Sequence, residues 1–346
     1  MWYKFKFLLI GLVAVALIGC SDDSGKEEEE KNIPEGKWSM LQFGFPDTLR
    51  SMFVTFDSKT EETYVGLGRC ACIGDASDPA TWHIGECRDL WRYSQYLGWK
   101  RMSDFPGQAR FGAVAFVIGN YAYVGLGMQE MSPVHAREYF KDFWRYDMGK
   151  DEWEEVQYAF PGNPRVHAVA FSINGKGYVG MGKKEDWNIV KDFYEFDPET
   201  GWKEILFPGD SRYGATAFAV DEKGYIGLGN SGSKPIVDFY RFDPTDGSWT
   251  AITTTSEYQP MARYFAAASV LYKGDEPYVY IMGGLDSDGQ KLTACWGYDP
   301  RNNKWMQVTP LPDGLGACAA LTPLKNEMVL LNNEGEMNGH IFSIGE

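Results

Sequence analysis

Five arginines occupy equivalent places in a repeated phrase, at intervals of 47 to 60 residues. Each one precedes a short run of small and apolar residues, as in "RFGAVAF" and "RYGATAF". A guanidinium group can hold a carboxylate or a sulfate through two parallel hydrogen bonds. If the five side chains meet on one face of the molecule, they could form a cationic funnel for an anionic ligand. The candidates are Arg50, Arg110, Arg165, Arg212 and Arg263.

Aspartates farther along the repeats offer a structural role for the same arginines. A buried charge needs a partner, so each arginine could instead pair with the aspartate of its own repeat. The fifth repeat keeps Arg263 but has Ala294 at the aspartate position, which leaves Arg263 the most available to a ligand. The sixth repeat has Gly314 and His340 at the two positions. The aspartates of repeats one to four are Asp89, Asp142, Asp192 and Asp238.

A cluster of three cysteines and one histidine has a spacing that could bind zinc. Cys70, Cys72, His83 and Cys87 form C-x-C and H-x3-C patterns. The N-terminal residues, described below, indicate that the protein is exported, and in exported proteins cysteines more often form disulfides than bind zinc. We therefore expect Cys87 to pair with Cys70 or Cys72, and we expect no metal site.

Other catalytic signatures are missing from the sequence. It contains no G-x-S-x-G, no H-E-x-x-H and no Walker loop. Its Gly-x-Gly phrases are not followed by helices, as dinucleotide fingerprints are, so we expect no cofactor. The net charge of −15 excludes nucleic acid, or an anionic membrane, as a partner of the whole surface.

The elements that must position these residues are β-hairpins. Two copies of the phrase read "RFGAVAFVIGNYAYVGLG" and "RYGATAFAVDEKGYIGLG". Each contains a strand of small residues, a polar turn and an aromatic strand that ends in glycines. A second hairpin follows each time, for example "DFWRYDMGKDEW", so each unit supplies four strands.

Tryptophans give the number of units. One tryptophan closes each of five units, and the sixth unit ends before any tryptophan. Trp38 supplies the missing one if a strand around "GKWSML" lies beside the last strand of the chain. The two ends would then share blade six and close the ring without an open sheet edge. We expect an all-β, six-bladed propeller over residues 37–346, with closing tryptophans Trp99, Trp153, Trp202, Trp249 and Trp305.

The units resemble kelch repeats, for which about 50 residues is the expected period. The resemblance rests on the glycines after the second strand, the tyrosine-rich third strand and the tryptophan of the fourth, and it covers residues 37–346. Four units carry Gly-Leu-Gly or Gly-Met-Gly, and only Gly283-Gly284 keeps the adjacent glycine pair of the family. The resemblance implies a kelch-type propeller with a central channel, as in the central domain of galactose oxidase.

One face of such a propeller collects the loops before the first strand and after the second strand of every blade. The loops after the second strand are longest in blades one and two, and long loops on one face of a repeat scaffold usually mark the binding face. We expect Trp82, His83 and His135 to lie there with the arginines, and Trp187 to offer a stacking platform. This arrangement favours a module that binds a glycan or a protein partner.

An enzyme is the alternative. The sequence resembles the periplasmic N-acetylneuraminate epimerases, which are also six-bladed kelch propellers. That resemblance implies a carbohydrate epimerase or mutarotase that uses arginines at the channel mouth on a sialic acid. The sequence offers an arginine ring but no convincing acid–base pair, so we favour binding and assign no catalytic residue.

The N-terminal residues have the layout of an export signal. Lysines precede an apolar run that is too short to span a bilayer, and Leu17-Ile18-Gly19-Cys20 resembles the lipobox of bacterial lipoproteins. We expect residues 1–19 to be a signal peptide, Cys20 to carry lipid, and residues 20–36 to form an acidic tether. The chain would then be a Gram-negative outer-membrane lipoprotein that faces the periplasm or the cell surface.

Overall fold

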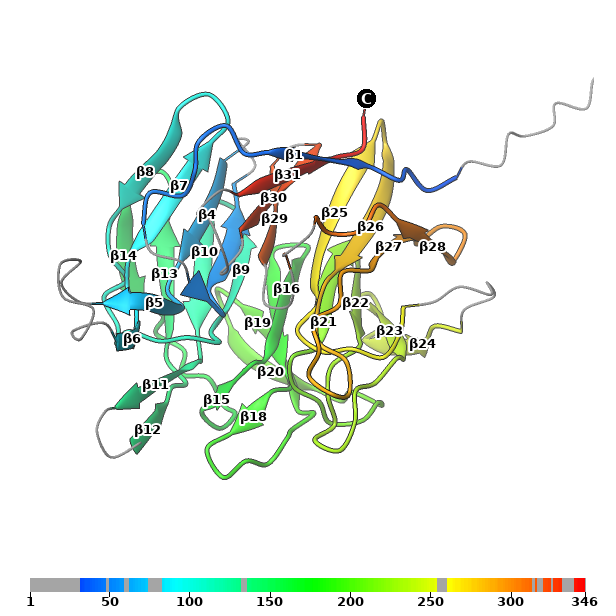
Figure 1. Cartoon of the computed structure of the whole chain (residues 1–346). Helices are drawn as coiled ribbons and strands as arrows, with labels where there is room; N and C mark the ends of the chain where they lie inside the picture. The colour runs from blue at the N-terminus through cyan, green and yellow to red at the C-terminus, as the bar shows by residue number, and fades with distance from the viewer. Residues whose placement is uncertain are drawn as a thin grey trace, which may run out of the picture. The chain divides into compact units, whose positions relative to one another are not determined.

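The computed structural model describes residues 32–47, 50–58, 62–73, 83–131, 136–253, 260–312, 315, 320–324, 326–331 and 339–345. Within these residues, six four-stranded antiparallel sheets surround a central axis (Figure 1). None of the described residues forms a helix long and apolar enough to cross a membrane. The fold is the all-β, six-bladed propeller that the repeats predict.

Blades one to three are meanders whose four strands follow one another in chain order from the central channel to the outer edge of the propeller. Blade one contains β3 (Val54–Asp57), β4 (Glu62–Gly66), β7 (Leu90–Ser94) and β8 (Gly98–Met102). Blade two contains β9 (Val114–Ile118), β10 (Tyr121–Gly125), β13 (Phe143–Asp147) and β14 (Glu152–Glu155). Blade three contains β16 (Val169–Ile173), β17 (Lys176–Gly180), β19 (Phe193–Asp197) and β20 (Gly201–Ile205).

Blades four and five repeat the same order, and blade six takes its outermost strand from the N-terminal part of the chain. Blade four contains β21 (Thr216–Val220), β22 (Lys223–Gly227), β23 (Phe239–Asp243) and β24 (Ser248–Ala251). Blade five contains β25 (Ala267–Lys273), β26 (Glu276–Met282), β27 (Cys295–Asp299) and β28 (Lys304–Val308). Blade six contains β29 (Ala320–Leu324), β30 (Glu327–Leu331), β31 (His340–Ser343) and β1 (Lys37–Met40).

Strand β1 closes the ring. It pairs antiparallel with β31, where Trp38 lies opposite Phe342 and the two ring centroids are 4.9 Å apart. The innermost strands contact one another around the axis, and β29 of blade six contacts β3 of blade one. The prediction that an N-terminal strand carrying Trp38 completes the last blade is therefore confirmed.

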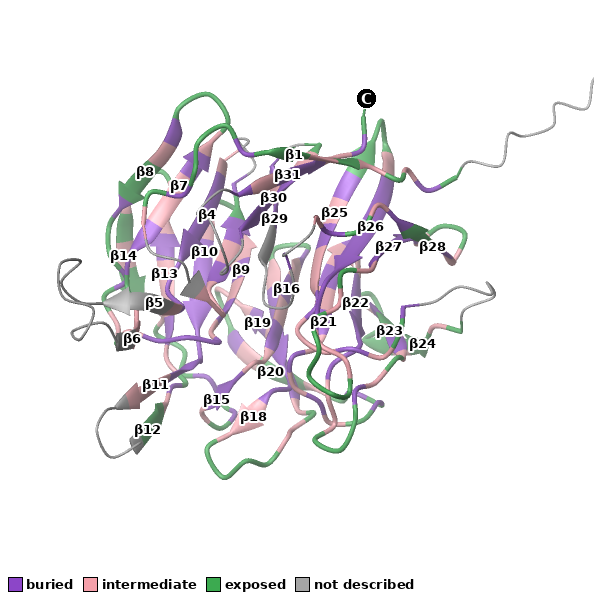
Figure 2. Ribbon diagram, in the orientation of Figure 1, coloured by how far each residue is buried: buried purple, intermediate pink, exposed green. Residues whose placement is uncertain are grey.

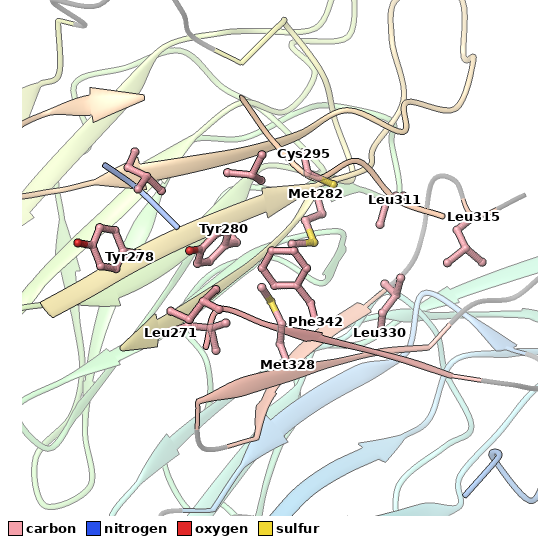
Figure 3. Packing of buried hydrophobic residues seen from close by; sticks show 13 residues of the cluster. Leu271, Tyr278, Tyr280, Met282, Cys295, Leu311, Leu315, Met328, Leu330 and Phe342 are labelled. Carbon is pink, nitrogen blue, oxygen red and sulfur yellow. The ribbon is translucent and has the colours of Figure 1, made fainter. Parts of the chain in front are cut away.

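The segment before β1 already belongs to the propeller. Ile33 is buried against blade five, and the Tyr280 hydroxyl donates a hydrogen bond of 2.9 Å to the carbonyl of Pro34. Figure 3 shows Tyr280, Met328 and Phe342 in the same apolar cluster, where blades five and six meet. The packed region thus includes Ile33, four residues before the boundary expected from the sequence. Residues 1–31 of the expected signal and tether lie outside the described residues.

Apolar side chains of neighbouring blades pack into shared clusters. Figure 2 shows that strands inside the blades, such as β10 and β26, are mostly buried. The closing tryptophans of blades one to three also donate hydrogen bonds to the segment that precedes their blade. Trp153 packs edge-on against Phe105 and donates a hydrogen bond of 3.0 Å to the Ser103 carbonyl. Trp202 donates in the same way to the Tyr158 carbonyl, at 3.1 Å. In blades two and three, the tryptophan that marks the repeat in the sequence therefore also ties its blade to the linker before it.

Small additional sheets extend from the first three blades. The loops of blade one form β2 (Arg50–Ser51), β5 (Arg69–Ile73) and β6 (His83–Glu86). Blade two adds the hairpin β11 (Met128–Met131) and β12 (Ala136–Tyr139), and blade three adds β15 (Arg165–Val166) paired with β18 (Lys183–Lys184). The β11–β12 and β15–β18 pairs lie at the lower edge of the propeller in Figure 1.

Candidate functional site

The repeated arginines of blades two to four are buried inside their blades. Arg110 donates from Nη1 and Nη2 to the two carboxylate oxygens of Asp142, at 2.6 and 2.9 Å. It also donates to the backbone carbonyls of Gln108 and Leu126, at 2.9 and 3.1 Å. We call this arrangement the arginine latch, because it ties together three turns of one blade. The same latch joins Arg165 to Asp192 and Arg212 to Asp238.

The latch satisfies both charges. Burial alone would raise the pKa of Asp142, but hydrogen bonds and charge attraction from Arg110 lower that pKa below its ordinary value. The guanidinium groups of Arg110, Arg165 and Arg212 are fully buried. Because a buried ion pair of this kind is already complete, the geometry matches the structural alternative for these arginines rather than a cationic funnel.

The mouth of the channel is formed by the residue two positions after each arginine. These residues have backbone φ angles of 53 to 62°, in the left-handed region, and their backbones join neighbouring blades through hydrogen bonds. Gly112 donates to the Met52 carbonyl, His167 to Gly112, Gly214 to His167, and Phe265 to Gly214, at 2.7 to 3.1 Å. We call Met52, Gly112, His167, Gly214 and Phe265 the rim residues.

A cavity of about 270 Å³ opens inside the rim. Its walls are mostly the small residues that begin the inner strands, including Ala113, Ala168, Ala215 and Ala267. Among the described residues that line it, only His167 has a titratable side chain. The arginines of the latches are not part of its lining.

His167 is held in its neutral form. Burial, and then the positive charge of Lys183, lower the pKa of His167 to about 4. Its ring lies edge-on to Phe265, with centroids 4.8 Å apart, and 6.4 Å from the ring of Tyr213. A neutral imidazole has one nitrogen that donates and one that accepts a proton, so His167 can act as an acid or a base at neutral pH.

Lys183 places a positive charge beside the rim. It lies opposite Val166 in the β15–β18 pair, next in sequence to His167. Its ammonium group is 3.7 Å from the ring centroid of Trp187 and 5.5 Å from that of Tyr213. Burial, and then the charge of Arg137, lower the pKa of Lys183 below its ordinary value. Within the described part of the chain, Lys183 forms no salt bridge with a carboxylate.

Trp187 provides an aromatic surface at the same place. Its side chain is 58 % exposed, and Lys183 and Arg137 both lie over its ring. Arg137 differs from Lys183 because it is paired with Glu130, at 3.3 Å. Lys183 is therefore the cation of this group that retains the capacity to bind an anionic ligand.

A second cavity, of about 530 Å³, lies farther along the inner strands. Ala268 lines both cavities, and Asp57, Ser269 and Tyr272 line the second one. Burial raises the pKa of Asp57. The second cavity has no lysine, arginine or histidine among its described lining residues, so an anionic ligand is better suited to the rim of the first.

The remaining sequence candidates are only partly placed by the structure. Trp82, His135 and Cys20 lie outside the described residues, and for Arg50, His83, Cys70 and Cys72 only the backbone is described. Cys87 is disulfide-bonded, as expected, although its partner lies outside the described side chains. No group of three or more potential metal ligands occurs among the described residues.

Sequence reasoning missed His167 and Lys183. The signal for His167 is present in the repeats, because "RVHAVAF" has histidine where "RFGAVAF" and "RYGATAF" have glycine. No comparable signal exists for Lys183, since its place beside His167 depends on the pairing of β15 with β18.

Comparison with known proteins agrees with the repeat assignment. Residues 160–320 match the model of the KLHDC2/KLHL20/DRC7 Kelch-repeats domain. The solved structure of YjhT superposes with a TM-score of 0.64 at 17 % identity, covering 86 % of this chain and 94 % of that one. This likeness shows the fold. The chain is a six-bladed β-propeller, and its residues 160–320 match a kelch-repeat model.

Several bacterial enzymes are similar in sequence. The N-acetylneuraminate epimerase of Yersinia enterocolitica is 28 % identical over 250 residues, which cover 69 % of this chain and 55 % of that protein. N-acetylneuraminate epimerase 1 of Escherichia coli O6:H1 is 27 % identical over 234 residues, covering 64 % and 55 %. The epimerase of Vibrio cholerae is 29 % identical over 128 residues, covering 37 % and 28 %. The chain thus spans about half the length, or less, of these curated relatives.

Proposed function

We propose that this kelch propeller binds a sugar acid at the cavity beside His167 and interconverts the two configurations at its anomeric carbon. One observation carries the proposal. His167, a neutral histidine in the cavity, lies beside Lys183, a lysine that has no salt-bridge partner among the described residues. Sequence similarity to N-acetylneuraminate epimerases gives independent support. N-acetylneuraminate is therefore the substrate to test first.

The reaction consists of two proton transfers and the reversible opening of the sugar ring. A base removes the proton of the anomeric hydroxyl, an acid protonates the ring oxygen, and the bond between the ring oxygen and the anomeric carbon breaks to leave an open-chain ketone. Rotation and ring closure from the other face, with both protons returned, complete the exchange. His167 is suited to be the base because it is neutral, and burial followed by the nearby Tyr264 raises the pKa of Tyr213, which keeps that phenol available as a proton donor.

Lys183 would hold the carboxylate of the sugar. An ion pair formed away from bulk water is stronger than one on the open surface, and Lys183 is only partly exposed. Trp187 lies next to it, where a sugar ring could stack on the indole. The cavity volume of about 270 Å³ is near the lower end for ligand pockets, roughly 300–1,000 Å³, which favours a single sugar over an oligosaccharide.

Binding of the carboxylate at Lys183 would also change the pKa of His167. The positive charge of Lys183 helps to lower the pKa of His167, so a bound carboxylate that neutralises this charge would raise it. A better base would then be present when the substrate is bound. This coupling links recognition of the acid group to the proton transfer.

An NMR time course tests the proposal directly. N-Acetylneuraminate that is freshly dissolved as one anomer should equilibrate faster with the protein than without it. Lys183→Met should weaken binding of the sugar by about 10-fold or more, as expected for the loss of a charge-assisted contact. Lys184→Met is the matched control, since Lys184 pairs with Asp186 and should leave both binding and exchange unchanged.

The outcomes separate the candidate functions. Binding of the sugar acid without faster exchange would leave the propeller as a glycan-binding module. The proposal would be refuted if the protein neither bound the sugar acid nor accelerated the exchange of its anomers.

We also propose that the chain is exported and anchored by lipid at Cys20 in the outer membrane. Two features support this: the lipobox-like sequence, and the disulfide at Cys87, which is typical of an oxidising compartment. Cys20→Ala should move the protein from the membrane fraction to the soluble fraction. Retention of the Cys20→Ala protein in membranes would contradict the proposal.

A further inference from the structure

Blade five contains a latch without its acid. Arg263 is fully buried and donates to the carbonyls of Met261, Gly283 and Ala294, at 3.2, 2.9 and 2.9 Å. The first two bonds correspond to those that Arg110 makes to backbone carbonyls in blade two. In blade five, however, Nη2 of the arginine has no hydrogen-bond partner among the described residues.

A second buried donor in blade five, the indole nitrogen of Trp296, also has no hydrogen-bond partner among the described residues. In blade two, the indole nitrogen of Trp144 donates to Oδ2 of Asp142, at 2.8 Å. The registers of the two blades show that Trp296 is the equivalent residue, because it lies opposite Ile281 as Trp144 lies opposite Val124. Its indole nitrogen is buried and, within the described part of the chain, has no acceptor.

Both unpartnered donors therefore belong to the position where the other latches have a carboxylate. Ala294 immediately precedes β27, as Asp142 immediately precedes β13. Alanine differs from aspartate by one carboxylate group. The protein thus keeps the arginine and the tryptophan that recognise this group, on a backbone that matches the blades where the group is present.

The nearby thiol does not replace the missing negative charge. Burial raises the pKa of Cys295 to about 12, so the thiol is neutral under physiological conditions. Burial also lowers the pKa of Arg263 to about 10, which still leaves the guanidinium charged at neutral pH. A buried cation without a counter-ion is strongly destabilising, so a bound anion would be favoured here.

We propose that blade five binds a small monovalent anion between Arg263 and Trp296, in place of the aspartate side chain of the other latches. The ligand is a carboxylate of the size of formate, or a halide. It does not belong to the cavity at the rim, because Arg263 does not line that cavity. The site is an internal anion site that stabilises the blade.

Thermal unfolding at constant ionic strength tests the site. Formate should replace a bulky anion that cannot enter the blade, such as gluconate. A hundredfold increase in formate should raise the melting temperature of the wild type by about 2 to 4 °C. Ala294→Asp should supply the carboxylate from the chain itself, raise the melting temperature in gluconate and remove the response to formate.

Blade two offers a matched control. Asp142→Ala leaves Arg110 and Trp144 in the arrangement that Arg263 and Trp296 have in blade five. This variant should be less stable than the wild type in gluconate. Formate should raise its melting temperature by more than it raises that of the wild type. Arg263→Met should lack the blade-five response.

A crystal of the wild type soaked in bromide provides a second measurement that does not depend on any variant. Anomalous density for bromide beside Nη2 of Arg263 is expected. The proposal is wrong if Asp142→Ala responds to formate while the wild type does not, or if no bromide is found at Arg263.

Discussion

His167 and Gly112 occupy equivalent places in neighbouring blades, and the His167 backbone donates a hydrogen bond of 3.0 Å to the Gly112 carbonyl. Both residues have left-handed backbone angles, with φ of 57° and 62°. Blades two and four use glycine at this place, as the geometry favours, whereas blade three carries a histidine. Blades one and five also carry side chains here, Met52 and Phe265, but among the five rim residues only His167 can transfer a proton.

His167→Gly separates these two roles. The glycine should fit the rim as Gly112 and Gly214 do, and relief of the left-handed strain, roughly 1 kcal/mol, should offset the lost contact with Phe265. We expect the free energy of unfolding to change little, while exchange of N-acetylneuraminate falls by about 10²-fold or more. Because Lys183 is untouched, the dissociation constant should stay within a few-fold of the wild type. Undiminished exchange in this variant would exclude His167 as the base.

The pH dependence of exchange should show the low pKa of His167. In the free protein this pKa is about 4, so kcat/KM should stay constant from neutral pH down to about 5 and fall below that as the imidazole gains a proton. The apparent pKa of kcat should be higher, since bound carboxylate offsets the charge of Lys183. Lys183→Met should raise the apparent pKa of kcat/KM by removing the like charge. Rates are compared after subtraction of the uncatalysed exchange, and a fall of kcat/KM near pH 6.5 would show that His167 is not the titrating group.

The arginine latches should differ in their contribution to stability. Arg110→Met leaves the Asp142 carboxylate partly buried without its ion pair, which should lower the free energy of unfolding by about 3 to 5 kcal/mol. Arg263→Met removes a cation that has no carboxylate partner in its latch, so in gluconate its cost should be clearly smaller. Urea unfolding of the two variants measures the difference. Equal costs would mean that the ion pair adds nothing beyond the bonds to backbone carbonyls.

Closure of the ring by β1 should be essential for stability. A chain that begins at Leu41 lacks Ile33 and Trp38, and therefore loses the contacts with Tyr280 and Phe342 that join blades five and six. We expect a loss of at least about 3 to 5 kcal/mol, as for the removal of one large buried side chain. A chain that begins at Asn32 is the control and should unfold like the full chain. Similar denaturation midpoints for both truncations would contradict the closure.

The sequence alone determined the architecture of this protein. Its repeated hairpins, the five closing tryptophans and the displaced Trp38 predict six blades and the strand that closes them, because each is a local pattern that recurs at a regular interval. The pairing of Arg110, Arg165 and Arg212 with aspartates could also be derived as one of two alternatives, since a buried charge requires a partner wherever the fold places it.

Only the tertiary structure decided which side chains face the channel. The repeats bring the arginines to the correct face, but the left-handed residue two positions later forms the mouth. The guanidinium groups of blades two to five turn into their own blades. The place of Lys183 beside His167 depends on a two-residue pairing between β15 and β18. The position that Nη2 of Arg263 and the Trp296 indole nitrogen share becomes visible only when these residues are compared with Arg110 and Trp144 in space. Such relations depend on backbone direction and on contacts between distant segments, which no local sequence pattern specifies.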